Sequence, residues 1–100
     1  MTSPLEILVL DFGDSVRGYD FRDVLGVKEA GVESADPDGR FVVNLGRLGP
    51  AREVRCREVL GSRVLPACDI RPVPEALCER MDGEKPWAVG ITGEGLCLLY

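Results

Sequence analysis

Apolar and polar residues alternate along this chain in short blocks that turn-forming residues separate. The first block, residues 5–12, is a compact apolar run between Pro4 and Gly13, and it predicts a buried strand. In residues 52–59 charged and apolar side chains alternate with a period of two, which predicts a strand with one face in water. Comparable blocks predict further strands at 16–21, 27–32, 40–45, 87–91 and 96–100. Residues 64–68 and 69–73 each contain a proline and predict edge strands or extended connections. Short strands with turn signals about every eight to twelve residues favour a mainly β fold, either one or two small barrels of antiparallel strands or a sandwich.

Two segments depart from this strand pattern. Residues 74–81 predict the one short helix, because Pro74 suits a first helical position and residues 82–83, Asp-Gly, end the run. Residues 33–39, with Asp-Pro-Asp-Gly at their centre, predict a loop. Gly18 interrupts a predicted strand, and we expect a bend or a bulge there.

The chain also resembles itself at an offset of 35 residues. Ile7–Gly26 aligns without gaps with Val42–Gly61, and six of the twenty aligned positions are identical. The strongest part of the match is Arg-acid-Val-Leu-Gly, which ends each segment.

This self-similarity has two explanations. One is chance similarity between two strand–turn–strand units, and the other is an internal duplication inside a single domain of residues 1–100. The duplicated units would span about residues 5–32 and 40–65 and pack around a pseudo-twofold axis. With either explanation we expect Gly26 and Gly61 at tight corners, where a side chain would clash.

Charge and length restrict the class of partner. The net charge is −5, with twelve basic residues scattered among seventeen acidic ones. This balance argues against nucleic acid and against an anionic membrane surface, since both need a basic face. The longest apolar runs are far too short to span a bilayer, and no signal peptide is recognisable at the N-terminus. The expectation is a cytoplasmic protein with no nucleic-acid partner and no membrane insertion.

The cysteine pattern and the absence of histidine make a metal site or a catalytic site less expected. The chain has no histidine and no C-x-x-C pair, so neither a metal site nor another cofactor is predicted. The four cysteines are expected to be reduced and mostly buried, and a reactive thiol is the alternative, because arginines neighbour two of them. These cysteines are Cys56, Cys68, Cys78 and Cys97.

One sequence motif suggests catalysis and is discounted. Asp11-Phe12-Gly13 spells the magnesium-binding triplet of protein kinases, but only ten residues precede it, so the rest of that site has no room. A strand followed by a turn explains the same residues. No pair of carboxylates stands in a pattern that fixes both on one cleft. The protein is therefore not expected to be an enzyme.

Three stretches resemble the CheW-like domain of bacterial chemotaxis coupling proteins. Residues 7–30 carry a strand, Tyr-Asp-Phe and then Asp-Val-Leu-Gly-Val; residues 57–77 carry Val-Leu-Gly and then Ile-Arg-Pro-Val-Pro; residues 87–100 are similar to the closing hairpin of the family. The resemblance implies two related five-stranded barrels. The chain is shorter than usual members, which suggests either that one barrel is reduced or that the protein is a divergent stand-alone member.

The resemblance also implies a function. A CheW-like domain is an adaptor that docks on the regulatory domain of a histidine kinase and on the tip of a chemoreceptor, without catalysis. The expected contacts are apolar groups at strand ends and neighbouring arginines, although core packing would explain the aromatic residues equally well. They are Phe21, Arg47, Leu48, Arg52 and Trp87. The alternatives are a small-molecule-sensing barrel, or a structural subunit whose exposed strand edges form a homodimer.

Overall fold

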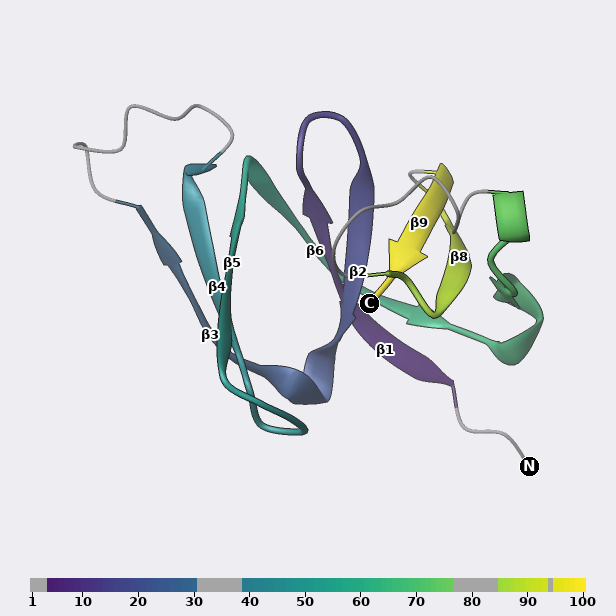
Figure 1. Ribbon diagram of the computed structural model, residues 1–100, viewed down its shortest axis with the longest axis horizontal. Helices are drawn as coiled ribbons and strands as arrows, with labels where there is room; N and C mark the ends of the chain where they lie inside the picture. Colours follow the sequence, from purple (N-terminus) through teal and green to yellow (C-terminus); the bar gives the residue numbers. More distant parts are fainter. Residues whose placement is uncertain (1–3, 31–38, 77–84, 94) are drawn as a thin grey trace.

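The computed structural model describes residues 4–30, 39–76, 85–93 and 95–100, and these residues are mainly in β-strands, as predicted (Figure 1). Two single-turn 3-10 helices, η1 (Phe21–Asp23) and η3 (Ala67–Asp69), interrupt them. The strands are β1 (Leu5–Asp11), β2 (Val16–Asp20), β3 (Val24–Glu29), β4 (Phe41–Leu45), β5 (Arg52–Cys56), β6 (Glu58–Leu65), β7 (Ile70–Arg71), β8 (Ala88–Thr92) and β9 (Gly95–Leu99). Glu75 and Ala76 are helical, and the rest of the predicted helix at 74–81 lies outside the described residues, apart from its first residue.

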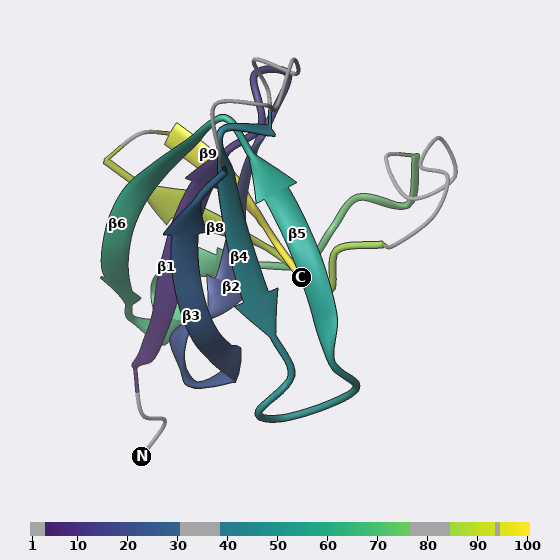
Figure 2. The same ribbon diagram turned by 90° about the vertical axis from the view of Figure 1, so that its left-hand side faces the viewer.

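The described strands form two sheets. A six-stranded sheet has the order β6-β1-β2-β9-β8-β7, and a three-stranded sheet has the order β3-β4-β5. Every ladder is antiparallel except the short one between β2 and β9. Figures 1 and 2 show the three-stranded sheet on one side of β1 and β2 and the β8–β9 hairpin on the other. Neither sheet closes on itself within the described residues, so a closed barrel stays a prediction.

Residues 7–10 of β1 are buried on both faces, which explains why this part of the strand is apolar without interruption. Ile7 and Val9 point into one core, and Leu8 and Leu10 point into another. The hairpin core lies between β1 and the C-terminal hairpin and consists of Ile7, Val9, Leu65, Ala88, Cys97 and Leu99. The central core lies between β1, β2 and the three-stranded sheet and consists of Leu8, Leu10, Tyr19, Val43, Leu45 and Cys56.

The 35-residue offset reappears in the strand pairing. Leu10 faces Arg17 in the β1–β2 ladder, and Leu45 faces Arg52 in the β4–β5 ladder. The two antiparallel hairpins therefore share one register when the first is shifted by 35 residues.

The third strand of each repeated unit pairs with the first strand of the other unit; the first unit holds β1, β2 and β3, and the second holds β4, β5 and β6. Strand β3 pairs with β4, and β6 pairs with β1, again at registers that differ by 35 positions. In both ladders the register shifts at the same point, so Leu25 in β3 and Leu60 in β6 are the extra residues of two bulges. The two segments are thus held together by exchanged strands.

The expectation that Gly26 and Gly61 occupy tight corners is wrong. Both lie inside strands, directly after the bulge leucines. A Cβ at Gly26 would meet no atom within 4 Å, whereas Gly61 has a φ of +108°, which favours glycine. The expectation of a bend or bulge at Gly18 is also wrong. Its ladder is regular, and a Cβ there would lie 2.8 Å from Cδ1 of Ile7 in the hairpin core.

The predicted strand at 52–59 is two strands. It breaks at Arg57, whose backbone N–H donates a 2.8 Å hydrogen bond to the carbonyl oxygen of Asp11. There the chain leaves the three-stranded sheet and joins the six-stranded one as β6, which begins at residue 58 instead of the predicted 64. Residues 22–25 are divided between η1 and the start of β3.

Candidate protein-binding surface

A buried carboxylate organises one end of the molecule. The side chain of Asp23, at the end of η1, accepts a 2.8 Å hydrogen bond from the backbone N–H of Leu48 and lies 3.4 Å from Nη1 of Arg52. Its backbone carbonyl accepts a 3.1 Å hydrogen bond from the N–H of Gly46. Asp23 is only 7% exposed. It therefore holds η1 against the turn between β4 and β5, and both views show these two segments side by side (Figures 1 and 2).

Three of the predicted contact residues are exposed at this end. Phe21 is 42% exposed in η1, Leu48 is 58% exposed in the turn, and Arg47 is exposed beside it. Together with Arg22 they form what we name the η1 surface. Apolar groups flanked by arginines are typical of protein interfaces.

The other two predicted residues do not belong to this exposed group. Arg52 is half-buried, pairs with Asp23 and lies 6.0 Å from the ring centroid of Tyr19. Its place suits support of the η1 surface more than contact with a partner. Trp87 is 57% exposed but directly precedes β8, where its N–H donates to the carbonyl of Leu99. Sequence reasoning grouped Trp87 with Phe21 and Leu48, whereas the structure places it beside the C-terminal hairpin.

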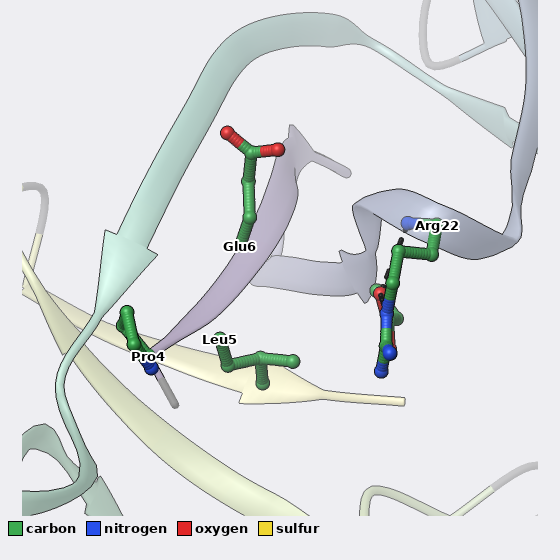
Figure 3. A pocket seen from close by; sticks show the side chains of 5 residues that line it. Pro4, Leu5, Glu6 and Arg22 are labelled. Carbon is green, nitrogen blue, oxygen red and sulfur yellow. Dashed lines mark hydrogen bonds and ion pairs between the residues drawn. The ribbon is translucent and has the colours of Figure 1, made fainter. Parts of the chain in front are cut away.

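A depression of about 290 Å³ adjoins the η1 surface (Figure 3). Its lining comes from the start of β1 and from both sides of Phe21, and consists of Pro4, Leu5, Glu6, Asp20 and Arg22. Sequence reasoning missed these residues. Glu6 looked like an isolated charge in an apolar run, and nothing local shows that β1 begins beside η1.

One ion pair forms a wall of this depression. Nη2 of Arg22 lies 2.9 Å from Oδ2 of Asp20, and Nε donates to Oδ1 at 3.2 Å. The backbone N–H of Arg22 donates to the same Oδ1 at 3.0 Å. The hydrogen bond from the Arg22 side chain lowers the pKa of Asp20. The two charges thus neutralise each other and fix the local shape of the wall.

No group of three or more potential ligands is placed to hold a metal ion within the described ranges. Burial, followed by the charge of Asp11, raises the pKa of Cys56 to about 11, so the activated thiol considered as an alternative is wrong at this position. Cys97 is buried and Cys68 exposed, while Cys78 lies outside the described residues. No helix in the described parts of the chain is long and apolar enough to cross a membrane.

The comparisons with known proteins point to one fold. No protein-family model matches the chain, and no curated protein matches it by sequence. Among solved structures it matches the scaffolding protein TtCheW from Thermoanaerobacter tengcongensis with a TM-score of 0.70, over 96% of this chain and 88% of that one.

The chain has a CheW-like fold. The two sequences are 12% identical, so what they share is the arrangement of the strands and not individual side chains. The CheW-like resemblance drawn from three short stretches is confirmed for the fold. The five predicted contact residues are not tested by this match, and they stay predictions.

Proposed function

We propose that this CheW-like domain is a non-catalytic signalling adaptor that binds the regulatory domain of a histidine kinase, a chemoreceptor, or both, in a chemotaxis-type pathway of the bacterial cytoplasm. The observation that carries the proposal is the fold match, which spans nearly the whole chain. TtCheW is itself described as a scaffolding protein. A scaffold works through contact surfaces alone, and this chain offers one at η1.

The η1 surface is the proposed docking site. Phe21 and Leu48 expose apolar groups on two segments that Asp23 fixes relative to each other. A fixed surface loses little conformational entropy on binding, so its apolar contacts contribute more fully to affinity. Arg47 and Arg22 add charged groups at its rim, where they would affect the association rate more than the affinity.

Isothermal titration calorimetry of the purified chain against the kinase regulatory domain, and against a receptor-tip fragment from the same organism, tests this proposal. We expect saturable binding to at least one of the two. Replacing two anchors together, Phe21→Ala and Leu48→Ala, should weaken binding at least about tenfold, because each buried anchor contributes on the order of 1 kcal/mol or more. The matched control is Leu96→Ala, since Leu96 is 71% exposed on β9.

Two results would contradict the proposal. If a folded sample, checked by circular dichroism, binds neither partner, the CheW-like fold serves another purpose. If binding occurs but the control weakens it as much as the double variant does, the docking site lies elsewhere. Sedimentation of the free chain over a range of concentrations separates these results from the homodimer alternative.

We also propose that residues of about 5–32 and 40–65 are duplicated units within one domain of residues 1–100. The shared register of the two hairpins and the matching bulges at Leu25 and Leu60 support this origin. Chance similarity of sequence would not require the same pairing of strands at the same offset.

A further inference from the structure

The central core is nearly symmetric under the 35-residue offset. Most residues that build it, or pack against its edge, come in pairs that this offset relates. These pairs are Leu8 and Val43, Leu10 and Leu45, Tyr19 and Val54, and Val24 and Val59. Each pair places one apolar side chain from each half into the same core.

The symmetry fails at one end of this core. Phe41 and Cys56 face each other across the β4–β5 ladder and close the core there, with Cys56 fully buried. Their counterparts 35 residues earlier are Glu6 and Phe21. Phe21 is 42% exposed, and Glu6 is exposed as well. Where one half has an apolar plug, the other half has a carboxylate and an open aromatic side chain.

The depression described above lies at this unplugged end (Figure 3). Pro4 and Leu5 supply apolar lining, and Asp20 and Arg22 compensate each other's charge. Figure 3 shows the Glu6 side chain pointing away from Arg22, on the opposite side of the β1 ribbon from the Leu5 side chain. Among the described residues no ion pair involves Glu6, whereas Asp20 and Arg22 pair with each other.

We propose that this depression receives a lysine or arginine side chain of the protein partner. The methylene stem would pack on Leu5 and Pro4, and the cationic head would pair with the Glu6 carboxylate. Charge complementarity selects this occupant, because an acidic side chain would meet Glu6 and a purely apolar one would leave that carboxylate desolvated and unpaired. The inference rests on the proposed adaptor function, since it names the chemistry of the partner at the same end of the molecule.

Calorimetry with the partner that binds, at low and at high salt, tests the partner's basic group. We expect Glu6→Gln to weaken binding about three- to fivefold and to flatten its salt dependence, as for a rim ion pair. Glu6→Lys should weaken it further, since like charges would then meet. Glu58→Gln is the matched control, because Glu58 is also exposed at a strand end, and it should leave the affinity unchanged. Unchanged affinity in both Glu6 variants would overturn the inference while leaving the adaptor function in place.

A second measurement needs no protein partner. Titrating the isotope-labelled chain with N-acetyl-arginine methylamide should shift the NMR amide signals of Leu5, Glu6 and Arg22 in the wild type and not in Glu6→Gln. The same concentrations of N-acetyl-glutamate methylamide should produce no such shifts. Absence of shifts in the wild type would overturn the inference. Their presence in a chain that binds neither kinase nor receptor would support the site and contradict the adaptor function.

Discussion

The β1–β2 and β4–β5 hairpins share one strand register, but the faces that they turn away from the central core differ in polarity and burial. On the side away from the central core, β1 and β2 carry Val9 and Gly18, which the β8–β9 hairpin covers. The same side of β4 and β5 carries Asn44 and Glu53, and no strand covers it within the described residues. Gly18 leaves space for Ile7, Leu99 and Cys97, whereas Glu53, its counterpart, is exposed and lies 3.5 Å from Arg55.

This difference shows that the side chains that set strand pairing are not the same as those that decide whether a further layer packs on the outer face. The bulge leucines show it most directly: Leu60 packs against the hairpin core, while Leu25 is 53% exposed. One apolar spot persists on the open face at Val42, which is 4% exposed between its ladder neighbours Lys28 and Arg55. Within the described residues, the outer face of β4 and β5 is therefore more polar and more exposed than that of β1 and β2.

The largest expected effect comes from exchanging side chains between the two outer faces. Val9→Asn should destabilise the fold by about 3 kcal/mol, because it removes a buried apolar group and buries an amide without partners. The reverse change, Asn44→Val, should stay within about 0.5 kcal/mol, because the side chain is partly in water. Urea unfolding followed by fluorescence measures both. Equal losses would show that the face of β4 and β5 is buried as well.

A smaller effect separates the two acidic residues that occupy equivalent positions. Asp23→Ala should cost about 2–3 kcal/mol, because the N–H of Leu48 loses its acceptor and Arg52 loses its ion pair. Glu58→Ala, at the exposed counterpart, should cost less than about 0.5 kcal/mol. Thermal unfolding compares the two, and Asp23→Asn, which keeps an acceptor oxygen, should fall between them. A comparable cost at both positions would mean that the η1 turn does not depend on the carboxylate.

The smallest effect on the fold is expected for a test of thiol reactivity at the two ends of the central core, the end that Cys56 closes and the end where Phe21 is exposed. Cys56 has a pKa raised to about 11 by burial, so at pH 8 its thiolate is scarce. A thiol introduced by Phe21→Cys should be alkylated by iodoacetamide at least about a hundredfold faster, as peptide mass spectrometry would show. Similar rates at the two positions would mean that both ends of the core are open.

The same raised pKa predicts how stability depends on pH. The folded chain favours the neutral thiol of Cys56, so this contribution is fully present below the ordinary pKa of about 9 and is lost as the pH rises toward 11. Unfolding curves of the wild type and of Cys56→Ala should therefore converge across that range. A constant difference between them would contradict the assignment.

Local pattern was sufficient to predict much of the fold. The apolar run at residues 5–12 predicted a buried strand, and the hairpin near the C-terminus lies close to the predicted positions. These features depend on side chains only a few residues apart. The 35-residue similarity was also visible in the sequence, but the exchange of β3 and β6 was not, because periodicity does not specify which strands pair.

The candidate surface was harder to predict, since it depends on contacts between distant segments. Phe21 and Leu48 were expected at strand ends, and the structure leaves both exposed, Phe21 in η1 and Leu48 in the turn between β4 and β5. What joins them is Asp23, which by sequence is one charged residue among many and by structure is buried against the turn. The same limitation placed Trp87 with this group, although it lies beside β8.

The exchanged strands have a mechanical consequence. Because β6 lies in the sheet of the first segment and β3 in the sheet of the second, the halves cannot swing apart like domains on a hinge. Separating them requires both the β1–β6 and the β3–β4 ladders to break, and those ladders also anchor the two cores. A force that pulls the two halves in opposite directions would therefore have to break both ladders before the halves could separate.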